Sequence, residues 1–306
     1  MKTLACLSCL CLLGAVAAAQ TGTLLHLKAT EQVIDESGHP VAGALATIGY
    51  YTNSQSVTVE KITGTNGLFE FQDTSPSEYA DYSFEAKKDG YYSIWQQVNL
   101  QSPYDPAKWN IEKTLVLKKV GNPIAMYAKS VDENPPTLGQ PVGYDLMAGD
   151  WVCAGHKGVN ADFIFQKWAY RKSGADYEYK VKITFPKSGD GIQIYAAPES
   201  EAGSGLRSPH EAPPDGYQPE LNKERSAHPG QPAKNDSDPH RIYFFRVRTA
   251  LDHNGNVVSA HYGKIYGDFM QFSYYLNPTP NDRNIEFDPK QNLLGGLKSF
   301  EQVNAP

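Results

Sequence analysis

Apolar and polar residues alternate along much of this chain, and a period of two is typical of half-buried β-strands. The longest alternating run covers residues 177–185, where Tyr, Tyr, Val, Ile and Phe take one face and mostly Glu and Lys take the other. Further runs predict strands at 41–51, 68–71, 82–86, 111–119, 162–165, 241–247, 257–266 and 269–276. The pattern predicts an all-β protein whose antiparallel sheets have one face on a core and one in water.

Turn-forming residues separate the strands of the first third of the chain. In the stretch 33–44, Asp35 can accept turn hydrogen bonds, Gly38 can adopt a positive φ, and Pro40 fixes φ where the chain leaves the turn. Asn66-Gly67 is a strong hairpin signal between two further strands. These turns predict hairpins that open and continue a β-sandwich.

Three motifs in this region occur in a fixed order. They are Val-Ile-Asp-x-x-Gly-x-Pro-Val-x-Gly-Ala at 33–44, Thr-Asn-Gly-x-Phe-x-Phe at 65–71 and Phe-x-Ala-x-x-x-Gly-Tyr at 84–91. Through them, residues 24–120 resemble the carboxypeptidase regulatory-like domain. The resemblance implies a transthyretin-like, prealbumin-like sandwich of about seven strands. It implies no activity, because that family is mostly non-catalytic and is appended to many secreted proteins.

The chain divides at residues 120–123, where Val-Gly-Asn-Pro interrupts the strand pattern and predicts a linker. We therefore expect one domain over 20–120 and a second antiparallel β domain over 121–306, for which no family is identified. Within the second domain, residues 196–240 are rich in Pro, Gly, Ser and charged residues and predict a disordered or loose loop. Residues 277–306 are expected to form an irregular segment on the surface.

The N-terminus has the pattern of a signal peptide, with Lys2, an uncharged apolar run to Val16 and then small residues. We expect residues 1–19 to be removed by cleavage between Ala19 and Gln20. The apolar run is shorter than the ~20 residues that span a bilayer, which disfavours a transmembrane anchor, and Gln20 stands where a lipoprotein would have Cys. A secreted or periplasmic protein of bacterial type follows, with no membrane span after cleavage.

Composition narrows the classes of partner. The formal net charge is −6 at pH 7 with scattered charges, which gives no basic footprint for nucleic acid. Three of the four cysteines fall in the expected signal peptide, so only Cys153 would remain and no intramolecular disulfide could form. The 19 Tyr, 12 Phe and four Trp suit the pleated surfaces of β-sheets.

Motif spacing argues against several chemistries that related folds perform. None of the eight histidines has His-x-His, His-x-x-Glu or His-Glu-x-x-His spacing, so a metallocarboxypeptidase is unsupported and neither a metal site nor a cofactor is expected. The close His pair of an intradiol dioxygenase and the Tyr-Arg-Gly-Ser ending of hydroxyisourate hydrolase are missing. Gly203-Ser204-Gly205 lacks the spacing of a nucleophile elbow.

One compact polar cluster remains, in which Asp150, Cys153 and His156 lie within seven residues. It could be a thiol nucleophile beside a base, or half of a metal site. The alternative is a strand end with a buried, inert thiol and a histidine in a turn. A hydrolase would require these groups to converge with His261 or Asp268 in a concave pocket.

Aromatic residues give the leading non-catalytic hypothesis, since exposed rings can stack on sugars. The candidates for such a platform are Trp95, Trp109, Trp151 and Trp168, with Tyr50, Tyr51, Tyr91 and Tyr92. Of these, Trp95, Trp151 and Trp168 are the proposed ligand-binding residues; the alternative is that most of the rings lie in the core.

Three functions stay open from the sequence. The first is a secreted, non-catalytic binding or structural module of the bacterial envelope or exterior, whose partner is a polysaccharide or another envelope protein. The second is a carbohydrate-binding protein that uses exposed aromatics. The third is a hydrolase whose site lies in the C-terminal domain.

Overall fold

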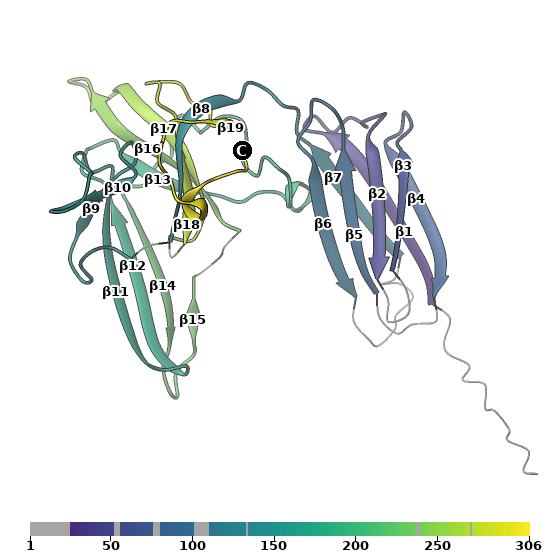
Figure 1. Cartoon of the computed structure of the whole chain (residues 1–306), viewed down its shortest axis with the longest axis horizontal. Helices are drawn as coiled ribbons and strands as arrows, with labels where there is room; N and C mark the ends of the chain where they lie inside the picture. The colour runs from purple at the N-terminus through teal and green to yellow at the C-terminus, as the bar shows by residue number, and fades with distance from the viewer. Residues whose placement is uncertain are drawn as a thin grey trace, which may run out of the picture.

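The computed structural model describes residues 25–51, 56–75, 80–100, 110–132, 134–236, 238, 240–269 and 271–306. Over these ranges the chain forms β-strands β1 to β19 and two short 3₁₀ helices, with no α-helix (Figure 1). The all-β prediction is confirmed. None of the helices in the described ranges is long and apolar enough to cross a membrane. The expected signal peptide, residues 1–19, and Trp109 lie outside the described residues.

The N-terminal domain is a sandwich of a three-stranded and a four-stranded sheet. The first sheet has the order β4-β1-β7 and is mixed, because β1 is antiparallel to β4 and parallel to β7. The second has the order β3-β2-β5-β6 and is antiparallel. The strand bounds are β1 Leu25–Asp35, β2 Leu45–Tyr51, β3 Ser56–Ile62, β4 Leu68–Ser75, β5 Ala80–Lys87, β6 Ile94–Leu100 and β7 Asn110–Leu117.

The turn at 33–44 forms as the sequence predicts. The Oδ1 atom of Asp35 accepts the backbone N–H groups of Ser37 and His39, each at 2.9 Å, and Gly38 has φ +80°. A second close approach lies beside it, where the Val33 N–H donates to the Gly67 carbonyl at 2.9 Å. A Cβ at Gly67 would stand 2.4 Å from the Val33 oxygen, so these two turns can pack together only with glycine there.

The C-terminal domain packs two six-stranded sheets face to face. Their orders are β10-β9-β11-β12-β14-β15 and β13-β16-β17-β18-β8-β19. Pairing is antiparallel as expected, except that β19 runs parallel to β8. The strand bounds are β8 Ile124–Val131, β9 Val142–Asp145, β10 Asp150–Val152, β11 Phe163–Ser173, β12 Asp176–Thr184, β13 Gly191–Tyr195, β14 Glu220–Ala227, β15 Lys234–Asn235, β16 Ile242–Leu251, β17 Val257–Gly267, β18 Phe272–Leu276 and β19 Phe287–Asn292.

Two apolar cores hold this domain together, one on each face of the second sheet. Between the sheets, half of the buried hydrophobic side chains are aromatic, such as Phe163, Phe165 and Phe245. On the outer face, Met126 and Phe244 are covered by residues 212–217 and 285–303, which include the 3₁₀ helix η2, Ser299–Glu301. The C-terminal segment therefore does lie over the surface, although part of it is strand β19.

The prediction of a loose loop at 196–240 is wrong. This segment contains the 3₁₀ helix η1, Glu199–Glu201, and the strands β14 and β15. Leu206, Ser208 and Ala212 in it are fully buried. The residues of β14 are largely polar on both faces, so no apolar alternation marks it as a strand. Backbone pairing with β12, rather than burial of apolar side chains, makes this segment a strand.

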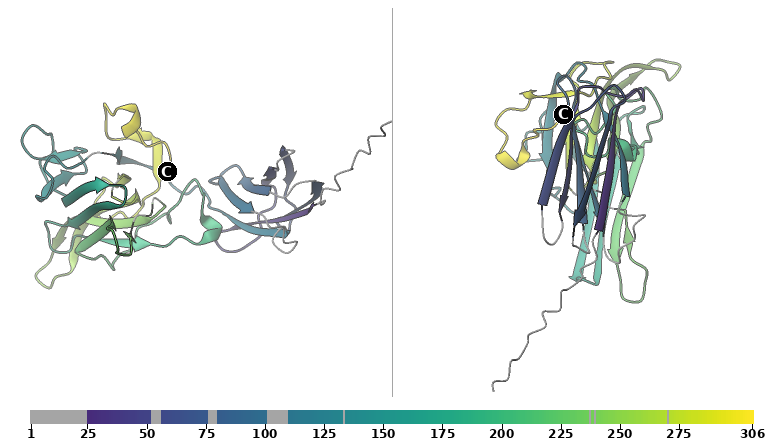
Figure 2. Two further views of the ribbon diagram at one scale, coloured as in Figure 1. Left: turned by 90° about the horizontal axis from the view of Figure 1, so that it is seen from below. Right: turned by 90° about the vertical axis from the view of Figure 1, so that its right-hand side faces the viewer.

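Residues 199–210 connect the two domains, and we call this segment the strap (Figures 1 and 2). Ser204 forms a β-bridge with Ile94 on β6, and the Gln96 amide donates to carbonyl groups of the strap. The ammonium of Lys118, a buried residue, lies 2.7 Å from the Glu201 carboxylate. The strap thus covers an edge strand that would otherwise present unpaired backbone groups.

Three strands of the C-terminal domain extend beyond its core. In Figures 1 and 2, β11, β12 and β14 run past the ends of the second sheet. On β11 burial stops after Lys167, and on β12 the buried residues begin only at Val181. We call the projecting part, residues 167–180 and 223–227, the arm.

Candidate binding site

The arm has an inner face that continues the core-facing side of the first sheet. Side chains two residues apart on a strand share a face, and directly paired residues of antiparallel strands lie side by side on it. The inner face therefore consists of three rows across β11, β12 and β14. From the core outward these rows are Lys167, Val181 and Lys223, then Ala169, Tyr179 and Arg225, then Arg171, Tyr177 and Ala227.

This inner face forms one side of an open groove of about 510 Å³. Asn134 and Leu138, from the segment after β8, also line it. That segment is fixed to the arm, because the Gly139 N–H donates to the Lys167 carbonyl at 2.7 Å and its carbonyl accepts from the Gln166 side chain. The volume is within the range of small-molecule sites, roughly 300–1,000 Å³.

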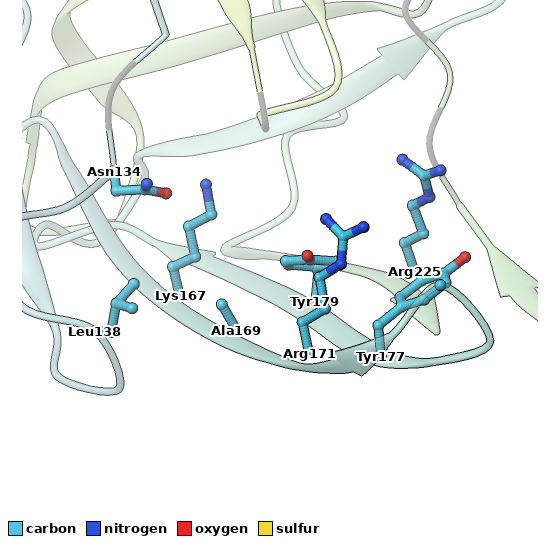
Figure 3. A pocket seen from close by; sticks show the side chains of 9 residues that line it. Asn134, Leu138, Lys167, Ala169, Arg171, Tyr177, Tyr179 and Arg225 are labelled. Carbon is cyan, nitrogen blue, oxygen red and sulfur yellow. The ribbon is translucent and has the colours of Figure 1, made fainter. Parts of the chain in front are cut away.

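Two tyrosines form an aromatic surface in the groove. The ring centroids of Tyr177 and Tyr179 are 5.7 Å apart with the planes tilted by 40°. The guanidinium of Arg225 lies 5.8 Å from the centre of the Tyr177 ring, in the range of cation–π contacts. Figure 3 shows the heads of Lys167 and Arg171 on the same side of the sheet as Tyr179. The groove thus offers ring faces bordered by hydrogen-bond donors.

Charge is distributed unevenly along the groove. Near the core Lys167 and Lys223 are 8% and 7% exposed, and burial lowers the pKa of both. The charges of Asp132 and Asp268 oppose that lowering at Lys167, and those of Asp236 and Asp268 oppose it at Lys223. Towards the tip, Arg171 and Arg225 are exposed. The arm therefore has buried lysines near carboxylates at its base and solvent-exposed arginines towards its tip.

The sequence candidates Asp150, Cys153 and His156 form a capped turn. The His156 Nδ1 lies 2.8 Å from Asp150 Oδ1, and the Lys157 N–H donates to Asp150 Oδ2 at 2.9 Å. Burial of Asp150 would raise its pKa, but these hydrogen bonds outweigh burial and lower it. Cys153 is exposed, so the expectation of a buried thiol is wrong; its carbonyl accepts the His156 N–H.

The partners of that turn are not those that a hydrolase would need. His261 places Nδ1 3.1 Å from the Asn277 carbonyl oxygen, and Asp268 faces the lysines of the arm. The contacts therefore do not support the convergence of these residues with Cys153 or His156.

The tryptophan candidates lie in different environments. Trp151 is only 2% exposed and packs edge-on against Tyr144 and Phe165, so it belongs to the core and its assignment to ligand binding is wrong. Trp95 is 50% exposed on β6 beside the strap, and Trp168 is 39% exposed. Trp168 lies on the outer face of the arm, where it borders a smaller groove of about 360 Å³.

Among the tyrosine candidates, Tyr50 is fully buried, Tyr51 is exposed, and Tyr91 and Tyr92 are partly buried. Tyr92 is a structural residue, since its hydroxyl donates to Glu286 Oε1 across the domain boundary at 2.5 Å. Of the described candidates for the platform, Tyr51, Trp95 and Trp168 have exposed rings, and these are divided between the two domains.

The sequence did not indicate the tyrosines of the groove as ligand-binding residues. Tyr177 and Tyr179 begin an alternating run that predicts a strand with its apolar face buried in the core along its whole length. One signal was present. The partner strand β11 alternates Lys167, Ala169 and Arg171 on the matching face, and cations at core-facing positions indicate that the core has ended.

A buried serine and lysine also come together, a pair that some hydrolases use. The Nζ of Lys264 lies 3.1 Å from Ser208 Oγ, and burial lowers the pKa of Lys264 well below its usual value. Both side chains are fully buried, between β17 and the strap. With no access for a substrate, the pair fits a structural role in holding the strap.

A buried ion-pair network joins β16 to the segment before β11. Arg248 donates from Nε to Asp162 Oδ1 at 2.7 Å and from Nη2 to Asp145 Oδ1 at 2.9 Å. Asp145 also accepts four backbone N–H groups. With these partners the network is well satisfied, and it positions the 145–162 segment rather than a reacting group.

No protein-family model matches the chain, and no curated protein matches it. Among solved structures, chlorocatechol 1,2-dioxygenase from Pseudomonas putida is 13% identical with a TM-score of 0.26, covering 31% of this chain and 61% of that one. A DUF3823 family protein from Parabacteroides merdae is 7% identical with a TM-score of 0.21, covering 86% of this chain and 99% of that one. The chain thus spans 61% of the dioxygenase. Such low scores establish neither a shared fold nor a shared function.

Proposed function

We propose that this protein is a secreted, non-catalytic carbohydrate-binding protein of a bacterial envelope or exterior. In this proposal the N-terminal sandwich is of the carboxypeptidase regulatory-like, transthyretin-like type and supports the C-terminal binding domain. The observation that carries it is the open groove of about 510 Å³ with Tyr177 and Tyr179 on its floor. Sugar rings have apolar faces that pack on aromatic rings, and their hydroxyl groups suit polar groups at the rim.

The lining of the groove favours binding over catalysis. Its described residues include no carboxylate, histidine or thiol. Glycoside hydrolysis uses two carboxyl groups on either side of the scissile bond, and general acid–base chemistry at neutral pH mostly uses histidine or carboxyl groups. A ligand seated on Tyr177 and Tyr179 would be held without a group placed to cleave it.

The proposal is tested by removing one ring at a time. Tyr177→Ala and Tyr179→Ala should each weaken retention on a bound polysaccharide by about tenfold, which corresponds to about 1.4 kcal/mol. Tyr170→Ala is the matched control, because this tyrosine is 49% exposed on β11 but at an outer-face position. A pull-down over a panel of insoluble and gel-immobilised polysaccharides measures the effect. Equal losses for all three variants, or no retention on any polymer, would contradict the proposal.

A further inference from the structure

The cations of the first sheet of the C-terminal domain differ between its two faces. On the outer face, Lys180, Lys182 and Lys234 pair with Glu178, Glu220 and Glu224 respectively. On the inner face, three of the described residues that line the groove are cations, Lys167, Arg171 and Arg225, and none of the described lining residues is an anion. The arginine ion pairs in the described part of the chain involve Arg241, Arg248 and Arg283 instead.

This arrangement is unusual for an acidic chain. The protein carries a net charge of −6, so the three cations and no carboxylate among the described lining residues are a local reversal of sign. Arg171 and Arg225 also keep their planar donor groups exposed, and guanidinium binds carboxylate and sulfate-like groups through paired N–H donors. Charge complementarity therefore points to an anionic ligand.

The spacing of these cations indicates more than one anionic group. Arg171 is on β11 and Arg225 is on β14, with β12 between them. Neighbouring strands are about 4.8 Å apart, so the two backbones are separated by roughly 10 Å. In Figure 3 the heads of Lys167, Arg171 and Arg225 are spread out and do not point to a single place. An extended chain with repeated acidic groups matches this layout better than one small anion.

We infer that the ligand of the groove is an acidic polysaccharide, whose sugar rings lie on Tyr177 and Tyr179 and whose carboxylate or sulfate groups bind Arg171 and Arg225. This inference rests on the proposed function and specifies its substrate class. At the inner end of the groove Lys167 is buried and faces the charges of Asp132 and Asp268. The exposed cations of the lining are Arg171 and Arg225, towards the tip of the arm.

Two matched polymer pairs test the inference with the intact protein. Polygalacturonate is compared with its carboxyl-reduced form, and dextran sulfate with dextran, by affinity gel electrophoresis. We expect at least one acidic polymer to bind about tenfold more tightly than its neutral partner, and this preference to shrink as NaCl rises from about 50 to about 500 mM. The pair that shows the preference tells carboxylate from sulfate.

Variants then assign the effect to the groove. Arg171→Gln and Arg225→Gln should each lower affinity for the acidic polymer by about tenfold and leave binding of the neutral partner unchanged. Lys180→Gln and Lys182→Gln remove the same charge from the outer face. They should leave the affinities for the acidic polymer and for its neutral partner unchanged. Loss of binding in all four variants alike would show a general charge effect and overturn the inference.

The outcomes separate the inference from the proposed function. Equal binding of acidic and neutral members in both pairs, still dependent on Tyr177 and Tyr179, would overturn the inference and leave the proposed function standing. No binding of any polysaccharide would overturn both. Tighter binding of a single-stranded oligonucleotide than of either acidic polysaccharide would overturn the ligand class.

Discussion

Glu31 places a carboxyl group in the core of the N-terminal sandwich, and this makes stability depend on pH. It lies on the inward face of β1 with Leu27, Ala29 and Val33, and its side chain is fully buried. Within the described part of the chain neither of its carboxyl oxygens has a hydrogen-bond partner. Burial, with a smaller contribution from the charge of Glu85, raises the pKa of Glu31 from 4.5 to about 8.

The magnitude follows from this shift. Between pH 4.5 and about 8 the folded chain keeps a proton that the unfolded chain has released. The free energy of unfolding therefore falls as pH rises, by about 1.4 kcal/mol per pH unit. Across the whole window the loss is roughly 4 to 5 kcal/mol. The contribution is fully present below pH 4.5 and is lost once the pH passes about 8.

Glu31→Gln removes the titration and keeps the shape of the side chain. When the pH is raised from about 5 to about 8, the free energy of unfolding of the variant should rise by about 3 kcal/mol or more relative to that of the wild type. Urea unfolding of the intact protein measures this, with a short protease pulse at each urea concentration so that fragments report the N-terminal sandwich separately. Glu70→Gln is the control, because Glu70 is exposed on β4.

One result would refute this reasoning. If the difference in unfolding free energy between wild type and Glu31→Gln is the same at about pH 5 and about pH 8, ionising Glu31 costs the folded state nothing. The carboxyl group would then have access to water or a partner, contrary to its burial.

Two other substitutions test the contacts that order the chain. Gly203→Ala would place a Cβ 1.8 Å from the Trp95 carbonyl oxygen at φ +79°, and should loosen the strap by about 1 to 3 kcal/mol; faster hydrogen exchange in β6 would show it, and unchanged exchange would contradict it. Arg248→Ala leaves the buried Asp162 without its ion pair and should destabilise the C-terminal domain by about 3 to 5 kcal/mol in urea unfolding. Arg241→Ala breaks a more exposed pair and should cost about 1 kcal/mol or less; equal effects of the two arginine variants would refute the burial argument.

Much of the secondary structure was predictable because it depends on neighbouring residues. The turn at 33–44 forms through the Asp35 carboxylate and a positive φ at Gly38, both of which are local properties. The strand at 177–185 appears as β12 with its predicted faces. The strand β14 was missed because its sequence is polar, and only pairing with β12 makes it a strand.

The candidate site was less predictable, since alternation says which residues share a face and not what covers that face. Tyr179 and Val181 share one face of β12, yet Val181 is buried in the core and Tyr179 lines the groove. Trp151 and Trp168 look alike in the sequence, but only Trp168 is exposed. The first difference depends on where the opposing sheet ends, and the second on which face of the sheet the side chain takes.

From the sequence alone follow the all-β class, the positions of most strands and the chemistry of the turns, because short-range sterics and a period of two encode them. The arm, the cations on its inner face and the strap at 199–210 follow only from the tertiary structure. Each depends on how far one sheet extends past another or on which edge strand lies nearby. Those are relations between residues far apart in the chain, and local patterning carries no information about them.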